Sequence, residues 1–490
     1  MAELEHFQML IDGEYVDASD GGTFESVNPA TEAAWATIPA ATADDVDRAV
    51  KAAHRAFTEG PWASTTPTQR GKYLRKLGDI LAENSEKLGL IESVDTGKMA
   101  KETKWQAAYI AEFFHFFGGL ADKITGHTLP IDKPDMDVFT NREPLGVVAA
   151  VVPWNSQLFL VAVKLGPALA AGNTIVLKAS EHASAAMLEF GKLIEEAGFP
   201  PGVVNIVSGL GEPCGRMLTT HPQVARISFT GGRHIIRNSA ENFAEVSLEL
   251  GGKSPVMVFE DADLESAANG IIAGIFGATG QSCVAGSRLY VQESVADELI
   301  GLIAATAKTI VIGDPLADET QMGPLATTGQ MAHIEKEVAY AIEQGAKVVH
   351  GGKRPEYLST GLYYEPTILE CPSQDTKIVD TELFGPVLSV LRFKDEEEVL
   401  RYANDTKYGL AAGIFTRDGA RQHRVAKAVR AGIVWVNTYR VVSPIAPFGG
   451  FGESGMGRES GADAIYDYTR PKTVWINTSS EPMSNPFVMR

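Results

Sequence analysis

The sequence predicts an α/β fold with two parallel-sheet domains in succession. From Gly146 onward, short Val- and Ile-rich runs alternate with helical stretches: GVVAAVVP, TIVLKAS, VVNIVSG and VARISF. The same texture returns in the second half as SPVMVFE, RLYVQ, VLSVLRF, LAAGIFT and GIVWVNT. Such apolar strands are typical of sheets that helices cover on both faces. The length of 490 residues also exceeds what one hydrophobic core usually holds.

Local signals place the first elements. Residues 9–16 form an expected hairpin around an Asp-Gly turn. Thr42 with Asp45 three residues later has the spacing of a capping box, and an amphipathic helical pattern follows it. Thr66 and Gln69, on either side of a proline, open a second helix in the same way. These signals predict a strand hairpin followed by helices before the first parallel sheet.

Two extended segments lie outside these domains. The stretch around residues 126–141 is polar and lacks helical periodicity, and KTVWINTS near the C-terminus has the pattern of a strand. Together they predict a small β arm.

Composition limits the classes of partner. The net charge of −19 argues against nucleic acid or an anionic membrane surface as a partner. No apolar run is as long as a membrane span, and the first residues lack the basic and apolar segments of a signal peptide. Three sparse cysteines indicate reduced thiols and a cytoplasmic location. The ten histidines show no ligand spacing, so we expect no catalytic metal.

Cys283 is the candidate nucleophile. It lies in Gly-Gln-Ser-Cys-Val-Ala-Gly, where small neighbours permit a tight backbone and an accessible thiol. Nucleophilic attack requires a lowered thiol pKa, supplied for instance by a helix N-terminus or nearby amides. From the thiol alone, the alternative of a buried and inert cysteine is the stronger one.

Two further polar residues follow expected strands. Glu249, in LELGGKSP, is a candidate general base, because partial burial raises the pKa of a carboxyl group. The alternative is an acid that forms a salt bridge with Lys253. Asn155 ends the strand GVVAAVVP, where its amide N–H groups suit a developing oxyanion. The alternative for Asn155 is a turn that caps the next helix.

Two glycine-rich turns also follow expected strands, at residues 208–211 and 229–232. Such turns let a phosphate approach the backbone at the start of a helix, although neither has the full G-x-G-x-x-G spacing. Lys178 and Glu181, after the strand TIVLKAS, are placed to hold the hydroxyls of a ribose. Taken singly, both are also ordinary surface residues.

Seven motifs follow one another in order: PWN (153–155), KASE (178–181), FTG (229–231), ELGG (249–252), QSC (281–283), ELFGP (382–386) and PFGG (447–450). In this order and spacing they resemble the aldehyde dehydrogenase superfamily, of the hydrolytic, NAD(P)-dependent type. The similarity extends from about Phe7 to Asn477.

This resemblance implies a mechanism. Cys283 attacks the aldehyde carbon, and Asn155 with the Cys283 backbone N–H holds the oxyanion. Hydride transfer to nicotinamide leaves a thioester, which water activated by Glu249 hydrolyses to the acid. A carboxylate at Glu181 favours NAD over NADP, although NADP remains open. The residues expected to bind the cofactor are Trp154, Lys178, Glu181, Gly211, Phe229, Gly231, Gly232, Glu382 and Phe384.

The resemblance also implies three structural parts. A Rossmann-like cofactor-binding domain takes residues 1–122 and 144–251, and a catalytic domain takes residues 252–466. An oligomerisation arm takes residues 123–143 and 467–490. Exchange of such arms makes dimers, often paired into tetramers, and covers strand edges that are otherwise unpaired.

The chain departs from the family pattern in three places, one of which, Gly452 in place of the usual lysine, is not at a catalytic position. The segment between Gly232 and Glu249 is about four residues short, roughly one helical turn, and Arg233 follows directly. We expect weaker or more mobile cofactor binding, unless residues are missing from this segment of the sequence. Smaller side chains along the expected substrate tunnel indicate a bulky aldehyde, and Arg440 is placed to pair with a substrate carboxylate. The alternative for Arg440 is a subunit contact. The expected substrate-binding residues are Ser156, Val163, Tyr439, Arg440, Val442 and Phe448.

Two other functions compete with this one. A CoA-acylating aldehyde dehydrogenase shares the cysteine and asparagine but usually lacks the acid at Glu249. A non-catalytic relative is the second alternative, should the short segment after Gly232 abolish cofactor binding. The aldehyde itself stays open among aliphatic, aromatic and semialdehyde classes.

Overall fold

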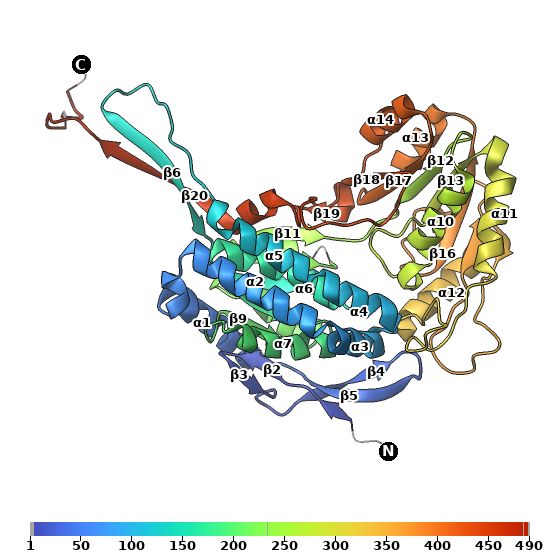
Figure 1. Cartoon of the computed structure of the whole chain (residues 1–490), viewed down its shortest axis with the longest axis horizontal. Helices are drawn as coiled ribbons and strands as arrows, with labels where there is room; N and C mark the ends of the chain where they lie inside the picture. The colour runs from blue at the N-terminus through green and yellow to red at the C-terminus, as the bar shows by residue number, and fades with distance from the viewer. Residues whose placement is uncertain (1–3, 233, 484, 489–490) are drawn as a thin grey trace.

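The computed structural model describes residues 4–232, 234–483 and 485–488, which form two α/β domains and a protruding two-stranded arm (Figure 1). The first domain contains an eight-stranded sheet in the order β19-β11-β10-β7-β8-β9-β2-β3. The strands from β11 to β9 are parallel, and antiparallel strands flank them. The strands of this sheet are β2 (Met9–Ile11), β3 (Glu14–Val16), β7 (Val147–Val151), β8 (Thr174–Lys178), β9 (Val204–Val207), β10 (Val224–Thr230), β11 (Glu245–Glu249) and β19 (Gly455–Met456).

Local sequence signals account for the start of the first domain. The predicted hairpin is confirmed: β2 and β3 pair antiparallel, and Asp12 and Gly13 have φ of 57° and 81° in the turn. Thr42 and Thr66 form the predicted capping boxes. The helices of the domain are α1 (Ala43–Thr58), α2 (Pro67–Glu83), α3 (Ser85–Thr96), α4 (Ala100–Tyr109), α5 (Ala111–Leu120), α6 (Gln157–Ala171), α7 (Ala185–Ala197), α8 (Arg216–Thr220) and α9 (Ile235–Ser239).

A small sheet beside the first domain was not predicted. Its order is β1-β5-β4, formed by Glu5–His6, Ala33–Pro39 and Thr23–Asn28. Alternating burial along β4 is the pattern of a strand with one exposed face. The chain also makes short helical turns: η1 (Pro61–Ser64), η2 (Ala121–Lys123), η3 (Gly211–Gly215), η4 (Gly277–Gly280), η5 (Glu293–Val295), η6 (Lys377–Val379), η7 (Gly452–Ser454) and η8 (Ala462–Tyr468).

The second domain has a seven-stranded sheet in the order β14-β15-β16-β13-β12-β17-β18, parallel except for β14. The apolar runs of the second half become its buried central strands, as predicted. Its strands are β12 (Pro255–Val258), β13 (Arg288–Gln292), β14 (Lys347–His350), β15 (Thr367–Glu370), β16 (Val387–Phe393), β17 (Ala411–Phe415) and β18 (Ile433–Val436). Its helices are α10 (Leu264–Ile275), α11 (Ala296–Ala307), α12 (Thr328–Glu343), α13 (Glu396–Asn404) and α14 (Gly419–Ala428).

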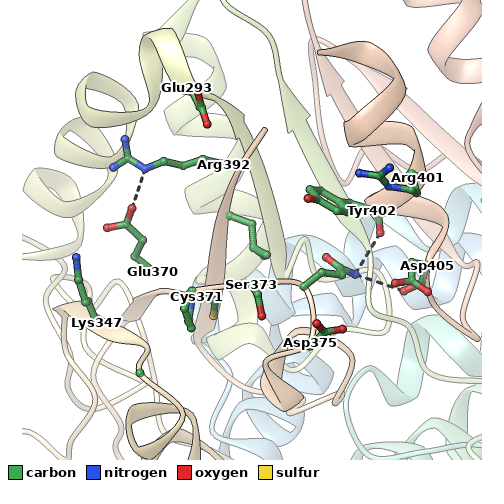
Figure 2. A pocket seen from close by; sticks show the side chains of 14 residues that line it. Glu293, Lys347, Glu370, Cys371, Ser373, Asp375, Arg392, Arg401, Tyr402 and Asp405 are labelled. Atoms are coloured by element: carbon green, nitrogen blue, oxygen red, sulfur yellow. Dashed lines mark hydrogen bonds and ion pairs between the residues drawn. The ribbon is translucent and has the colours of Figure 1, made fainter. Parts of the chain in front are cut away.

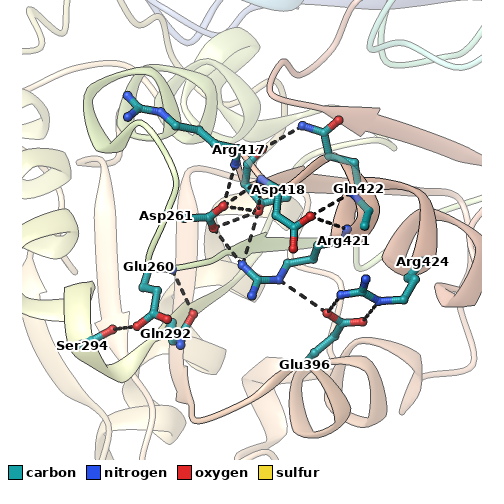
Figure 3. Close-up of polar contacts among 12 residues, drawn as sticks. Glu260, Asp261, Gln292, Ser294, Glu396, Arg417, Asp418, Arg421, Gln422 and Arg424 are labelled. Carbon is teal, nitrogen blue, oxygen red and sulfur yellow. Dashed lines mark hydrogen bonds and ion pairs between the residues drawn. The ribbon is translucent and has the colours of Figure 1, made fainter.

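A polar cluster holds α14 to the end of the second sheet (Figure 3). The Asp261 carboxylate accepts hydrogen bonds from the Thr416 hydroxyl, at 2.8 Å, and from the backbone N–H groups of Arg417 and Asp418. Arg421 forms an ion pair with the same carboxylate at 2.8 Å. Charge-assisted hydrogen bonds of this kind fix a helix terminus against a strand end, so we assign this cluster to architecture.

The predicted arm is an antiparallel pair of long strands, β6 (Met136–Pro144) and β20 (Thr469–Asn477), which project away from both domains (Figure 1). Between β18 and β20 the chain returns to the first domain. There β19 joins the edge of the first sheet, and Ala464 and Ile465 of η8 lie in the first domain's core. The last part of residues 252–466 therefore packs with the first domain.

Candidate active site

Asn155 lies at the point where the strand order of the first sheet reverses. It is in the loop between β7 and α6, and β8 and β10 flank β7 on opposite sides, which is the usual ligand position in parallel sheets. Its Nδ2 donates a hydrogen bond to the Gln281 carbonyl oxygen at 3.1 Å, two residues before Cys283. The N-cap of α6 is Ser156, and no side chain caps that helix. Asn155 therefore bridges the two domains instead of capping α6.

Cys283 follows a strained turn. In η4, Ala278 and Thr279 have φ of 51° and 55°, which is costly for residues with a Cβ. A Cβ added at Gly280 would lie 2.2 Å from the Gly385 carbonyl oxygen, so this close approach requires glycine. The turn presents Cys283 partly exposed, whereas Cys214 and Cys371 are buried. Of the three cysteines, Cys283 is the one that is not fully buried.

The charges around Cys283 oppose its ionisation. Burial raises the pKa of the Cys283 thiol to about 12, and the carboxylates of Glu249, Glu382 and Glu459 contribute in the same direction. A lowered thiol pKa was the expectation, and the protein alone produces the opposite. The free chain therefore disfavours the thiolate, first through burial and then through these carboxylates.

Glu249, the last residue of β11, is 4% exposed, and in the described part of the chain neither carboxylate oxygen has a hydrogen-bond partner. Burial raises its pKa well above the usual range, and Glu459 raises it further, against the charges of Lys164 and Arg458. No ion pair joins Glu249 to Lys253 among the described residues, so that alternative is wrong. Burial lowers the pKa of Lys253 itself to about 8.

A buried ion pair near Glu249 escaped the sequence analysis. Lys164, fully buried in the middle of α6, pairs with Glu459 and donates a hydrogen bond to the Ser228 hydroxyl at 3.2 Å. The only available signal was a lysine inside the otherwise apolar stretch QLFLVAVKLGPALAA. A lysine in such a position needs a partner, but sequence alone does not identify one 295 residues away.

The expected ribose-binding pair lies together after β8. The buried Lys178 Nζ donates to the Ala179 carbonyl oxygen at 2.8 Å and lies 3.4 Å from Glu181 Oε2. Burial opposes ionisation of Glu181, but Lys178 and a backbone hydrogen bond outweigh it and hold the pKa of Glu181 below its usual value. Glu181 therefore presents a negative charge that is one-third exposed.

Glu382 and Phe384 lie across the domain boundary from this pair. The Glu382 carboxylate accepts the backbone N–H of Gly252 at 2.9 Å, three residues after Glu249. Phe384 has a φ of 55°, and its ring packs edge-on against Trp154 with centroids 5.5 Å apart. Trp154 and Phe384, two of the expected cofactor residues, are thus in contact. Glu382, a third, accepts a hydrogen bond from the segment that follows Glu249.

The expected glycine turns differ in geometry. Gly231 has a φ of +135°, and its N–H donates to the Glu249 carbonyl oxygen at 3.1 Å. Gly232 lies next to it, and Phe229 is in the neighbouring strand β10. Gly211 is exposed, with open space at its Cβ position. Arg233 lies outside the described residues, and α9 then has only five residues.

The expected substrate residues divide into two groups. Ser156, Arg440, Val442 and Phe448 are partly exposed, and the Val442 carbonyl oxygen accepts a hydrogen bond from the Tyr109 hydroxyl at 2.9 Å. Val163 is 1% exposed in the core of the first domain.

Tyr439 is buried behind the Cys283 segment. It is 7% exposed, and its hydroxyl donates to the Val284 carbonyl oxygen at 2.9 Å. Its ring also fills the space at which a Cβ of Gly274 would project. Tyr439 therefore supports the Cys283 backbone from the core, whereas the sequence analysis expected it to bind the substrate.

A surface cavity of about 660 Å³ lies elsewhere, at the outer side of the second domain (Figure 2). Its lining mixes cations and carboxylates, including the Arg392–Glu370 ion pair at 2.7 Å, and contains none of the predicted site residues. In the described residues, no His, Cys, Asp and Glu cluster has the arrangement of a metal site. Among those same residues, every helix is too short or too polar to cross a membrane.

The family model described as "Aldehyde dehydrogenase family" matches residues 15–474. The chain belongs to the aldehyde dehydrogenase family. Over 99% of this chain and all of the relative, it is 54% identical to (Z)-2-((N-methylformamido)methylene)-5-hydroxybutyrolactone dehydrogenase of Acinetobacter baylyi. It is 41% identical to betaine aldehyde dehydrogenase of Bacillus subtilis, over 96% of this chain and 97% of that protein.

Solved structures agree with this assignment. The NAD⁺ complex of aldehyde dehydrogenase from Bacillus cereus has a TM-score of 0.95 and 41% identity, with 97% of each chain covered. The crystal structure of a putative aldehyde dehydrogenase from Burkholderia cenocepacia has a TM-score of 0.96 and 43% identity, with 99% of each chain covered. The predicted family, α/β fold and enzyme class are therefore confirmed.

Proposed function

We propose that this protein oxidises an aldehyde to a carboxylic acid with NAD, with Cys283 as nucleophile, Asn155 as oxyanion donor and Glu249 as general base. The buried Glu249 carboxylate carries the proposal, because its oxygens have no partner in the described part of the chain and its charge acts on the Cys283 thiol. A buried acid costs stability, so its presence beside an accessible thiol favours a catalytic role.

The protein's groups suit two successive half-reactions. Cys283 Sγ bonds to the aldehyde carbon, and the Asn155 amide with the Cys283 backbone N–H stabilises the oxyanion of the thiohemiacetal. Bound NAD supplies a nicotinamide ring that accepts the hydride. The resulting thioester needs an activated water. Glu249 is suited to take its proton, because burial and Glu459 raise the pKa of its carboxyl group toward the working range.

The residues present fit a dinucleotide. Gly231, with φ of +135°, allows the backbone to approach a phosphate beside β10. Lys178 and the charged Glu181 suit ribose hydroxyls at the end of β8. A 2′-phosphate would place two or so negative charges against Glu181, so we propose NAD as the preferred cofactor. Glu382, held by Gly252, is placed to bind the second ribose.

The substrate class follows from the relative that is 54% identical. The name of that protein's substrate contains a 5-hydroxybutyrolactone, which is the ring-closed form of a 4-oxobutanoate: its carboxylate oxygen has added to the aldehyde carbon. We propose that this chain also takes an aldehyde with a carboxylate a few atoms from the carbonyl. The expectation of a bulky substrate is compatible with this, because the relative's compound carries a branched substituent.

Product analysis separates this function from its alternatives. Purified protein is incubated with NAD and a panel of aldehydes that varies chain length, ring and charge, and NADH absorbance is followed. Release of free acid without CoA supports the hydrolytic reaction. Dependence of turnover on CoA would favour the acylating enzyme, and no turnover with no NAD binding would favour a non-catalytic relative. Glu249 argues against the acylating enzyme.

We also propose that the arm makes the protein a homo-oligomer, a dimer or a tetramer. Residues 127–129 cover one edge of β6 and β20 covers the other, and among the described residues β20 has no strand partner on its outer edge. Trp475 and Ile476 on β20 are 58% and 45% exposed. Exposed apolar strands with free edges normally find a partner. Deletion of residues 469–490 is expected to reduce the mass measured by light scattering to that of a monomer. Three free thiols support a cytoplasmic location.

A further inference from the structure

Three polar side chains meet beside Asn155. Lys98 follows α3, Gln106 is in α4, and Ser156 is the N-cap of α6. The Lys98 Nζ lies 2.9 Å from Gln106 Oε1 and 3.4 Å from Ser156 Oγ. It also lies 3.5 Å from Glu92 Oε1, and its side chain is only 3% exposed. The cluster brings a buried positive charge next to the residue that we propose as the oxyanion donor.

The chemistry of lysine fixes how its partners are oriented. An ammonium group can only donate hydrogen bonds, so Gln106 must turn its Oε1 toward Lys98 and its two N–H groups away. For the same reason the Ser156 oxygen accepts from Lys98 and keeps its own O–H to donate. Among the described residues, no acceptor is assigned to the Gln106 amide, and the Ser156 hydroxyl does not cap α6. Both side chains are partly exposed. Two donors are therefore available.

The position of α4 shows where these donors lie. Glu102 and Tyr109 are on the same face of the helix as Gln106, at helical spacing. Glu102 lies 3.8 Å from Arg440, and the Tyr109 hydroxyl donates to the Val442 carbonyl oxygen at 2.9 Å. This face therefore meets the 440–442 segment of the second domain. Ser156 borders the same space next to Asn155, so the donors lie between the proposed oxyanion site and that segment.

We propose that Gln106 and Ser156, with the charge of Lys98 behind them, bind an oxygen of the substrate's carboxylate and thereby select 4-oxo acids over alkyl aldehydes. The inference rests on the proposed function and adds the group that recognises the second end of the substrate. The Lys98 charge polarises both donors, and partial burial strengthens their bonds to an anionic acceptor. An alkyl chain leaves both donors unsatisfied and so binds less well.

Arg440 is the rival for this task. Its guanidinium donates to the Ala273 carbonyl oxygen at 3.0 Å and lies near the chain's own carboxylate Glu102. The Glu102 carboxylate offsets the positive charge that Arg440 offers to a second carboxylate, whereas the Gln106 amide and the Ser156 hydroxyl have hydrogens left to donate. The geometry therefore favours the pair on α4 and α6.

The test compares kcat/KM for 4-oxobutanoate and for pentanal, a neutral aldehyde of similar size. The variants are Gln106→Leu, Gln106→Glu, Ser156→Ala and Arg440→Ala. The control is Lys104→Ala, since Lys104 is on α4 but pairs with the exposed Glu86. We expect Gln106→Leu to lower kcat/KM for 4-oxobutanoate by about 10- to 100-fold, mainly through KM, and to leave pentanal unchanged or improved. Gln106→Glu replaces the donor with an acceptor and should lose at least as much. Ser156→Ala should lose less.

The outcomes separate this inference from the proposed function. If the wild type oxidises both aldehydes and the ratio of the two kcat/KM values stays constant in the Gln106 and Ser156 variants, the inference is overturned and the function stands. An equal loss for both aldehydes, or a loss confined to Arg440→Ala, also overturns it. If the wild type oxidises neither aldehyde nor any other in the panel, both fall. Thermal unfolding confirms that each variant folds, and should Gln106→Leu not fold, Gln106→Glu and Ser156→Ala decide.

Discussion

Removal of the Glu249 charge should make the Cys283 thiol more reactive and should also abolish hydrolysis of the thioester. The substitution Glu249→Gln keeps the shape of the side chain and removes a carboxylate that raises the pKa of Cys283. Two charges 4 Å apart at an effective dielectric of about 20 interact by about 4 kcal/mol. We take a separation of about 8 Å for this pair, since the Glu249 oxygens form no hydrogen bond with the thiol. Half that energy, about 2 kcal/mol, corresponds to a fall of about 1.5 pH units in the thiol pKa.

This fall translates into a modest gain in rate. Well below the thiol pKa, the thiolate fraction rises about 30-fold for 1.5 pH units. A less basic thiolate is a poorer nucleophile, with a Brønsted coefficient of about 0.4–0.5, which leaves a net acceleration of about 5- to 10-fold. Glu249 opposes the thiolate only when it is ionised. The acceleration should therefore vanish below the pKa of Glu249 and grow as the pH rises through it.

Alkylation by iodoacetamide, a neutral reagent, measures this effect across pH in the absence of cofactor. A Cys283→Ser variant supplies the background from the two buried cysteines. Equal rates in the wild type and in Glu249→Gln at every pH would refute the electrostatic argument. A constant ratio at every pH would instead show that the substitution had changed access to the thiol. Whatever its alkylation rate, Glu249→Gln should accumulate the thioester when NAD and aldehyde are added.

Three further results are expected. Asn155→Ala should lower kcat by about 10²- to 10³-fold in steady-state assays, because one oxyanion donor is lost; a loss below threefold would exclude that role. Lys164→Met should lower the free energy of unfolding by about 3–5 kcal/mol in denaturant titrations, because Glu459 stays buried without its cation; unchanged stability would mean that Glu459 is neutral in the folded protein. Insertion of four residues after Gly232 should tighten the Kd for NAD in calorimetry, whereas a micromolar Kd in the unaltered chain would contradict weak binding.

Local signals predicted much of the fold because short segments determine them. The turn at Asp12, the capping boxes at Thr42 and Thr66 and the apolar central strands each depend on neighbours within a few residues. The arm also followed, since both of its segments have extended patterns without helical periodicity, and β6 and β20 pair with each other. The sequence did not predict β19, a two-residue strand that joins the first sheet only because the chain returns there.

The site was predictable in its motifs and unpredictable in its electrostatics. Cys283, Glu249 and Asn155 stand in recognisable motifs, whereas the partners that set their environment are distant in sequence. Lys164 and Glu459 are 295 residues apart and show no shared pattern. The direction of the Cys283 pKa was missed for the same reason, because burial and three separate carboxylates determine it.

The charge pattern around Cys283 couples the thiol to the cofactor. Burial raises the pKa of the Cys283 thiol, and three carboxylates raise it further, so the free protein disfavours the thiolate. The nicotinamide ring of oxidised NAD carries a positive charge, and in the proposed function it would be bound near the thiol and these carboxylates. A cation there favours the thiolate, and by reciprocity the thiolate favours the cation. If the proposed function holds, burial and these carboxylates together would make the thiol most reactive in the complex that also holds the hydride acceptor.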